Sequence, residues 1–425
     1  MPLPFLYETF TNGLPTWVPD WARDPWTVFK VVIVVGAFYI LKKYTNGTRN
    51  TADKNMHGRV VMITGGTSGI GAATTRELAS RGAQIVLLTR DSPSNPFLAD
   101  YIGGLRESTK NQMIYAEQVD LSSFHSIRKF ATKWIDNAPP RRLDMIILCA
   151  ATMTPPGRKR TETDEGVEEM WMVNYLANFH LLGILSPAIR AQPIDRDVRI
   201  IIPTCSSYIS SPLLNETFGK KQWTAGKAYA RSKLALMVFG QAYQKHLDAY
   251  ERPDKLPSNA RVVFVDPGYT RTPGMRRWLT RGSIDRLALY LLGYAFPWFL
   301  LKSPEMGAQS ILYAVMESAL GRGSGGKFIK ECIEVDFARH DVKDEAVAKQ
   351  LWESSDKLIE KTEKEQAALR ALEKKEQELR AQDKQEKEKA EEIESLVGAI
   401  KKGKEKEAEK KPSRKQKKKA HAEKS

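Results

Sequence analysis

A tyrosine and a lysine lie four residues apart in the segment "AYARSKLALMVFG", as Tyr229 and Lys233. Residues at this spacing share one face of an α-helix. A phenol titrates near pH 10, so it exchanges protons poorly at neutral pH, but a nearby ammonium group favours the phenolate and lowers its pKa. The pair is therefore a candidate for proton transfer in acid–base catalysis. The alternative is an ordinary amphipathic helix, because this spacing is common by chance.

A glycine-rich stretch, "TGGTSGIG", follows the apolar run "RVVMIT" and precedes a helix-like segment. Gly65 allows a tight turn, and Gly69 and Gly71 allow the backbone to approach a phosphate and the helix to pack on the strand. Free amide groups and the dipole at a helix start attract a pyrophosphate. The loop therefore predicts a dinucleotide site, with the Tyr229 helix following a later strand that ends in Ser-Ser.

The spacing TGxxxGIG, taken with Tyr229 and Lys233, resembles the short-chain dehydrogenase/reductase family over residues 56–340. The likeness is to its retinol-dehydrogenase-like branch, which includes fungal lipid-droplet and endoplasmic-reticulum members. Four further segments resemble that branch in family order: "VDL" at Val119–Leu121, "VNYLANFHLL" around Asn174, "DPGYTRT" from Asp266 and "SPEMGAQSILYAV" from Ser303.

The resemblance implies residue roles. Tyr229 would exchange a proton with the substrate oxygen while hydride moves between substrate and nicotinamide, and Lys233 would hold the nicotinamide ribose and tune the phenol. Asn174 would shape the central helix and support a water relay. A serine would hydrogen-bond the substrate carbonyl. The stretch "IPTCSS" gives Ser207 this place, with Ser206 as the alternative if the register differs by one.

The resemblance also implies a cofactor site, and the residues assigned to it are Gly65, Thr67, Ser68, Gly69, Ile70, Gly71, Arg90, Asp120, Leu121, Cys149, Asn174, Tyr229, Lys233, Pro267, Thr270 and Thr272. The second strand ends in "LLTRD", which offers Arg90 where an NAD enzyme usually carries an acid. A guanidinium suits a 2′-phosphate, so we predict NADP(H). The alternative is that Arg90 only caps a solvated turn.

Two segments depart from the family pattern. The usual NNAG after the fourth strand is "LCAA" at 148–151, and the usual HPG is DPG at Asp266. The first change removes asparagine side chains that brace the strand end. These changes weaken cofactor contacts and keep a slow or degenerate enzyme open as an alternative.

The region 56–340 alternates short β-branched runs with helical patterns, and its candidate strands are "RVVMIT", "QIVLLT", "QMIYAEQVD", "LDMIILCA", "RIIIPT" and "ARVVFVD". Continuous apolar strands are buried on both faces, as in parallel sheets. We therefore expect an α/β fold, a Rossmann-type doubly wound parallel sheet with helices on both sides.

Residues 1–55 contain the apolar run Trp26–Leu41, interrupted by Lys30. Sixteen helical residues span roughly 24 Å, and flanking lysines can extend that reach by snorkelling. We expect a membrane anchor, spanning or held in one leaflet, on the endoplasmic reticulum or a lipid droplet. Positive residues after the run place the catalytic domain in the cytosol. The alternative is a buried helix packed on the main domain.

A second apolar stretch, Leu287–Leu301, is broken by Pro297 and corresponds to the family's substrate cover. Its bulk suits a lipophilic substrate such as a retinoid, a sterol or a long-chain aldehyde or ketone, and it could grip the same membrane as the anchor. The alternative is a normally buried helix pair.

Residues 341–425 form a charged tail, expected as a solvated helix that ends in the disordered "KKPSRKQKKK". A coiled coil with a helical partner is the alternative, and the tail could also bind anionic lipid. The net charge is +15, but residues 401–425 alone hold 12 Lys or Arg against 4 Glu. This argues against a basic nucleic-acid-binding core. The three cysteines, without CxxC spacing, predict neither disulfides nor a metal site.

The sequence therefore predicts a membrane-anchored NADP(H)-dependent oxidoreductase for a lipophilic alcohol or carbonyl. The family resemblance also allows a homodimer. The rival is a catalytically weak scaffold or tether on lipid droplets or endoplasmic reticulum that uses the same fold for contacts. The intact Asn174, Tyr229 and Lys233 argue against it, and "LCAA" argues mildly for it.

Overall fold

The computed structural model describes residue 19 and residues 24–216, 218–219 and 221–409. Its centre is an eight-stranded sheet in the order β3-β2-β1-β4-β5-β6-β7-β8. All neighbouring strands pair in parallel except β7 and β8. The predicted doubly wound parallel sheet is confirmed, and all six predicted strands are present. The sequence analysis missed the two short edge strands.

The strands are β1 (Val60–Thr64), β2 (Gln84–Thr89), β3 (Ile114–Gln118), β4 (Met145–Leu148), β5 (Val198–Pro203), β6 (Ala260–Asp266), β7 (Lys327–Lys330) and β8 (Ile333–Val335). The helices of the domain are α3 (Gly69–Ser80), α4 (Pro96–Thr109), α5 (Phe124–Ile135), α6 (Glu169–Trp171), the π-helix η2 (Met172–Leu176), α7 (Ala177–Arg190), the 3₁₀ turn η3 (Ser206–Ser210), α8 (Ala225–Asp248), α12 (Pro304–Met316), α13 (Ala319–Arg322) and the 3₁₀ turn η4 (His340–Lys343).

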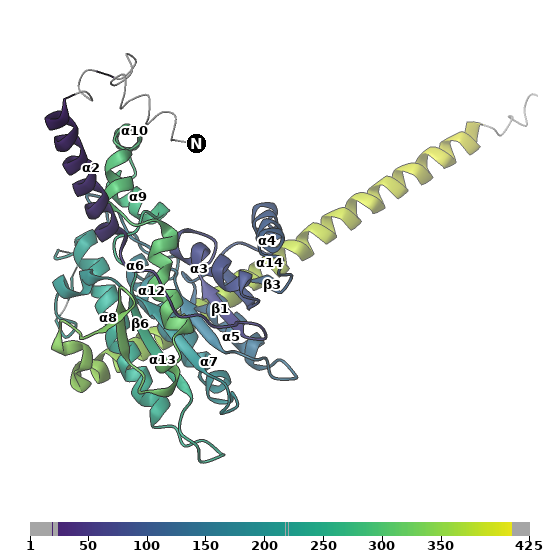
Figure 1. The fold of residues 1–425 in the computed structure, drawn as a ribbon. Helices are drawn as coiled ribbons and strands as arrows, with labels where there is room; N and C mark the ends of the chain where they lie inside the picture. Colours follow the sequence, from purple (N-terminus) through teal and green to yellow (C-terminus); the bar gives the residue numbers. More distant parts are fainter. Residues whose placement is uncertain (1–18, 20–23, 217, 220, 410–425) are drawn as a thin grey trace, which may run out of the picture. The chain divides into compact units, whose positions relative to one another are not determined.

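Helices lie on both faces of the sheet (Figure 1), and two clusters of buried hydrophobic side chains join them to it. One contains side chains of α5, α7 and α8, and the other contains side chains of α3, α4 and α12. The strand order reverses between β1 and β4, because β2 and β3 lie to one side of β1 and β5 to β7 lie beyond β4. In open α/β sheets ligands bind at the carboxyl ends of the strands at such a switch point. The fold thus places a crevice where the glycine loop follows β1.

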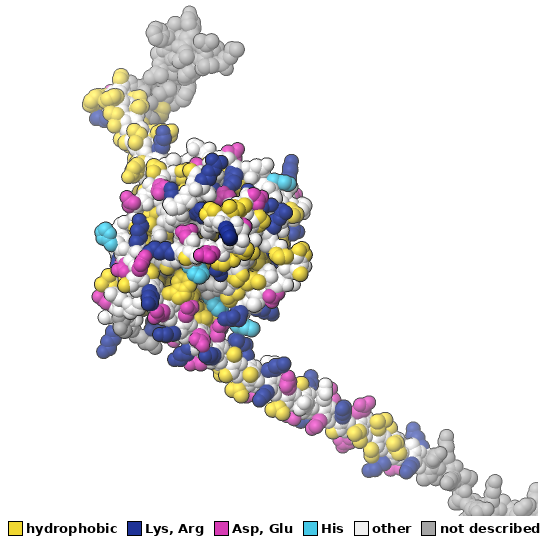
Figure 2. Space-filling view, turned by 90° about the horizontal axis from the view of Figure 1, so that it is seen from below, with side chains coloured by type: hydrophobic (Ala, Val, Ile, Leu, Met, Phe, Trp, Pro, Cys, Tyr) yellow, Lys and Arg dark blue, Asp and Glu magenta, His cyan; other side chains and the backbone are white. Residues whose placement is uncertain are grey.

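The N-terminal helix α2 (Pro25–Asn46) begins at Asp24, whose carboxylate accepts the backbone N–H of Thr27 at 3.0 Å. It buries none of its residues, so the alternative of a helix packed into the main domain is wrong. Figure 2 shows hydrophobic side chains covering this projecting helix. This helix of 22 residues is long and apolar enough to cross a membrane. The second segment that passes this test, Glu169–Arg190, is mostly buried and belongs to the domain core.

The long helix α14 (Glu345–Glu409) belongs to two compact units of the chain. The first unit ends at Ile359 and the second begins at Glu360. In the first unit Leu351 and Ile359 are buried, and Trp352 packs on Phe179 and Phe239. The packed domain therefore extends beyond the expected boundary at residue 340. In the second unit most described side chains of the helix are exposed, although Thr362 is buried, and the helix carries i,i+4 ion pairs, as a solvated helix should. The segment "KKPSRKQKKK" lies outside the described residues.

Candidate active site

The glycine loop has the geometry that the sequence predicted. Gly65 has φ +66°, and a Cβ there would lie 2.8 Å from the backbone of Ala150. Gly69 has φ +55°, with Thr272 Cγ2 3.1 Å from its would-be Cβ. Only glycine tolerates both the left-handed backbone and this close approach. The loop therefore leaves free backbone at the start of α3, next to the ends of β1 and β4.

Helix α8 carries Tyr229 and Lys233. It begins at Thr224, whose hydroxyl accepts the backbone N–H of Lys227. The Lys233 ammonium is buried, lies 5.8 Å from the centre of the Tyr229 ring and donates to the Pro203 carbonyl at 3.3 Å. The predicted shared face is thus present, and the end of β5 holds the lysine in place.

The expected lowering of the phenol pKa is not found among the protein's own groups. Burial raises the pKa of Tyr229 well above its usual value, and Cys205 and Asp266 raise it further. Burial also lowers the pKa of the Lys233 ammonium, against the opposite effect of Cys205 and Cys149. Because desolvation disfavours charge on both groups, proximity alone does not make the phenol acidic.

The two candidate serines have different partners. Ser206 Oγ donates to the Asp266 carboxylate at 2.8 Å. Ser207 Oγ lies 2.8 Å from Cys205 Sγ, and that thiol lies 3.8 Å from the Tyr229 hydroxyl. Ser207 is therefore linked to the phenol through one side chain, whereas the Ser206 hydroxyl is held by β6.

Asn174 lies within the π-helix η2, where the backbone widens between α6 and α7. Its side-chain oxygen accepts the Thr152 N–H at 2.8 Å, and its nitrogen donates to the Thr152 carbonyl at 3.0 Å and to Ser232 at 3.1 Å. π-Bulges often mark functional sites. Asn174 thus ties the segment after β4 to helix α8, one residue before Lys233.

The two departures from the family pattern are accommodated locally. In "LCAA", the Ala150 N–H donates to Thr64 Oγ1 at 3.1 Å, which braces the strand end in place of an asparagine side chain. In DPG, Asp266 accepts Ser206 and also the Gly268 N–H at 2.9 Å. Burial raises the pKa of Cys149 to about 12, so this thiol is uncharged at neutral pH where it lines the cleft. Both segments act on the catalytic pair electrostatically, because Asp266 adds to the effect of burial that raises the pKa of Tyr229, and Cys149 opposes the effect of burial that lowers the pKa of Lys233.

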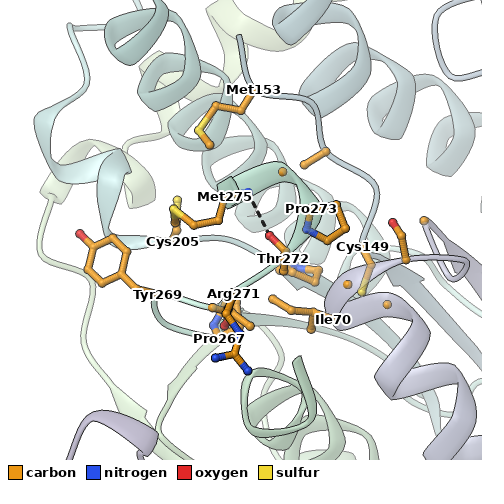
Figure 3. A pocket seen from close by; sticks show the side chains of 18 of the residues that line it. Ile70, Cys149, Met153, Cys205, Pro267, Tyr269, Arg271, Thr272, Pro273 and Met275 are labelled. Carbon is orange, nitrogen blue, oxygen red and sulfur yellow. Dashed lines mark hydrogen bonds between the residues drawn. The ribbon is translucent and has the colours of Figure 1, made fainter. Parts of the chain in front are cut away.

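One large cleft, of about 2760 Å³, collects these residues at the carboxyl edge of the sheet (Figure 3). Every predicted catalytic and cofactor residue lines it except Asn174, which is fully buried behind it. Typical small-molecule pockets have roughly 300–1,000 Å³. The cleft therefore has room for a dinucleotide and a second large ligand.

Arg90 and Asp120 lie at one end of this cleft. Arg90 is exposed after β2, and its carbonyl accepts the Gln118 side chain at 3.2 Å. Asp120 is partly exposed and binds the backbone and hydroxyl of Ser122. The Arg90 guanidinium is therefore free to meet an anionic group at the end of β2.

Several residues that line the cleft were not predicted from the sequence. They include Cys205, Met153, Met275, Tyr269 and Arg271, all of which are labelled in Figure 3. The position of Cys205 just before Ser206 was a usable signal, because strand ends meet at this edge. Met153 lies in the segment after β4 and the others follow β6, and the sequence does not determine the course of either segment.

The cleft suits a nicotinamide dinucleotide by its own geometry. A Cβ at Gly65 or Gly69 would occupy the approach to the helix start. Among the described residues, two buried polar atoms on its walls, Thr204 Oγ1 and Arg271 Nη1, have no hydrogen-bond partner. Buried polar atoms are normally paired, so these two await a ligand or water. The residues present fit a phosphate-bearing cofactor.

Comparisons with known proteins agree with this geometry. The family model "short chain dehydrogenase" matches residues 59–281. The chain is 41% identical over 373 residues to the uncharacterized oxidoreductase pbr1 of Schizosaccharomyces pombe, covering 86% of this chain and 97% of that protein. It is 31% identical over 327 residues to human retinol dehydrogenase 13 (77% and 92% covered). It is 30% identical over 327 residues to mouse polyprenol dehydrogenase (76% and 91% covered).

Proposed function

The chain belongs to the short chain dehydrogenase family, and on that basis we propose that it interconverts a lipophilic alcohol and its aldehyde or ketone with NADP(H) at a membrane surface. Membership makes it an oxidoreductase of a class that uses NAD(P) and acts on CH–OH groups. The observation that carries the finer proposal is the convergence of Tyr229, Lys233 and Ser207 on a cleft that also contains the glycine loop.

The bound nicotinamide would exchange hydride with the substrate carbon. Tyr229 presents its hydroxyl to the cleft, and because burial raises its pKa the phenol is protonated at neutral pH and can donate to a carbonyl oxygen. Ser207 supplies a second hydroxyl near the phenol, because the Cys205 thiol contacts both the Ser207 and the Tyr229 hydroxyl groups. Two donors at one oxygen stabilise the negative charge that develops there.

Lys233 and Asn174 position this group. The ammonium of Lys233 is held by the Pro203 carbonyl at the strand end, where it would bind the ribose hydroxyls. Asn174 fixes both backbone groups of Thr152 and contacts Ser232 on α8. Together they hold helix α8, which carries Tyr229, against the end of β5 and the segment after β4.

The preference for NADP(H) rests on Arg90. Its guanidinium follows β2 at the place where the adenosine ribose of a bound dinucleotide would lie, and it offers a cation for a 2′-phosphate there. Asp91 lines the same cleft, and its backbone carbonyl accepts the Thr89 hydroxyl at 3.0 Å, so the proposal requires the Arg90 guanidinium to outweigh the neighbouring carboxylate. A cytosolic pool rich in NADPH would then drive reduction.

Membrane attachment is proposed from α2. A helix of 22 residues spans roughly 33 Å, close to the thickness of a hydrocarbon core. It exposes Val32, Val35 and Ile40 by 60–68%. Such a surface is stable only in lipid or against a partner. We place the domain on the cytosolic side of the endoplasmic reticulum or a lipid droplet, and the two relatives named for retinol and polyprenol support a lipophilic substrate that would reside in such a membrane.

The test is consumption of NADPH by full-length protein in vesicles, screened over retinal, ketosteroids and long-chain aldehydes. Turnover of at least one of them is expected, and Tyr229→Phe should lower it by about 10²–10⁴-fold. Tyr250→Phe, on the loop after α8, is the matched control. If no carbonyl is turned over while Tyr229→Phe keeps the cellular role of the wild type, the tether is the correct function.

A further inference from the structure

A second exposed apolar surface lies beside α2. Helices α9 (Pro273–Leu279), α10 (Ile284–Leu292) and α11 (Ala295–Leu300) follow the loop after β6, and they bury none of their residues. Leu289, Leu292 and Phe296 are 69%, 87% and 74% exposed. The alternative of a normally buried helix pair is therefore wrong. An apolar surface of this size marks an interaction site.

This surface is continuous with α2. Lys42 Nζ donates to the carbonyls of Trp298 at 2.7 Å and Phe299 at 3.2 Å, at the end of α11. Phe38 packs edge-on against Phe299, and the Thr45 hydroxyl also donates to the Phe299 carbonyl. The last carbonyls of a helix lack partners of their own, so Lys42 caps α11 from the neighbouring helix. Figure 1 shows α2 and α10 projecting from the same side of the domain.

The catalytic cleft opens where these helices meet. Its walls include residues 42–49 at the end of α2, Trp278 and Leu279 of α9, and Trp298 and Leu300 of α11. The same walls contain Tyr229 and Lys233. A ligand can therefore pass from the apolar helices to the phenol within one cavity.

The charges around this surface are one-sided. Between Arg271 and Leu301 the chain has five arginines and a single acid, Asp285. Arg276, Arg277, Arg281 and Arg286 are exposed. Basic residues near an anionic leaflet are attracted to it. Apolar side chains bordered by arginines match a lipid leaflet, with acyl chains below anionic headgroups, better than they match a protein surface.

We infer that α10 and α11 insert into the same lipid leaflet as α2, and that the lipophilic substrate enters the cleft from that leaflet between α2 and α11. This route rests on the proposed function for its substrate, but the insertion itself does not. A second copy of the chain covering the same helices is the competing occupant.

Insertion is tested without activity. Leu292→Cys in the full chain is coupled to an environment-sensitive fluorophore and bound to vesicles of phosphatidylcholine and phosphatidylserine, with lipids that carry a quencher on the acyl chain. Signal from the native thiols is subtracted with identically treated wild type. Quenching should match that of a label at Val35→Cys and be absent at Leu256→Cys, before β6. An unquenched label at 292 overturns the inference, and a signal that changes with protein concentration instead identifies a second copy.

Entry from lipid is tested by kinetics in the same vesicles. The double variant Leu292→Arg, Phe296→Arg should raise KM for a long-chain carbonyl dissolved in the bilayer by roughly tenfold or more, because arginine enters lipid at high cost. Turnover of a short, water-soluble carbonyl and KM for NADPH should not change. Ile194→Arg with Leu256→Arg is the matched control. Equal effects on both carbonyls, or none, overturn the entry route, whereas absence of turnover by wild type rejects the proposed function and leaves the quenching result standing.

Discussion

The ammonium of Lys233 lies 5.8 Å from the centre of the Tyr229 ring and hydrogen-bonds the Pro203 carbonyl, so the lysine is fixed to the strand end and not to the phenol. The main role of Lys233 is therefore that of a cation fixed at the end of β5, beside the place where a cofactor would bind. Its influence on the phenol would depend on a bound ligand in contact with both, since burial, Cys205 and Asp266 all raise the pKa of Tyr229.

Replacing Lys233 by methionine keeps the volume and removes the charge. We expect NADPH binding to weaken by about tenfold or more, the equivalent of one charged hydrogen bond of about 1.5–3 kcal/mol, and kcat to fall as well. Binding is measured by quenching of protein fluorescence, and kcat by NADPH consumption. Lys245→Met, in an exposed pair with Glu345, is the control. Unchanged binding would contradict the proposed role.

The serine assignment is tested by two alanine variants. Ser207→Ala should lower kcat by about 10²–10³-fold, as the loss of one oxyanion donor does. Ser206→Ala should change kcat less, because its hydroxyl bonds Asp266. A larger loss in Ser206→Ala would assign catalysis to that serine instead.

Cofactor choice is tested at Arg90. The wild type should prefer NADPH over NADH by roughly ten- to hundredfold in kcat/KM, the range that one charged hydrogen bond supplies. Arg90→Gln should lose this preference through a higher KM for NADPH. Arg142→Gln, an exposed arginine before β4, should keep it. Equal use of both cofactors by the wild type would end the NADP(H) proposal.

The stability of the sheet end depends on Asp197. It accepts Arg199, which is fully buried, at 2.9 and 2.6 Å and Lys54 at 2.7 Å. Burial works against the charged form, but the bonds from Arg199 and Lys54 outweigh it and hold the pKa of Asp197 below 3.8. Asp197→Asn should reduce the free energy of unfolding by about 3–5 kcal/mol at pH 7.

The pH dependence of this effect has a definite sign. Because the folded pKa is depressed, the stabilisation is complete above the unfolded value and is lost as the pH falls through the folded pKa, below 3.8. The difference between wild type and Asp197→Asn in chemical denaturation should therefore shrink only in that acid range. Asp195→Asn, which is exposed, should match the wild type throughout. A constant difference down to the acid limit would contradict the assignment.

The first turns of α14 are part of the domain. A chain that ends after Asp344 loses Leu351 and Ile359 from the core and the bond between Tyr175 and Ser355, 2.7 Å long. Each buried aliphatic side chain contributes about 1.5–3 kcal/mol. This chain should therefore unfold at a markedly lower temperature or aggregate, whereas one that ends after Gln366 should keep the wild-type melting temperature. Equal melting of the two would show that α14 contributes nothing.

Sequence by itself determined six of the eight strands, the glycine loop and the Tyr229–Lys233 pair, because these depend on local patterns: β-branched runs, glycine spacing and the helical period. It also found both apolar helical segments. It could not decide between Ser207 and Ser206, whose difference lies in partners from β6 and from Cys205. It could not see that α14 begins inside the core, because the boundary depends on Tyr175 and Phe179, far away along the chain. Tertiary structure alone decided that α2 and α11 meet at the cleft, since a contact such as that of Lys42 with Trp298 leaves no mark on local sequence.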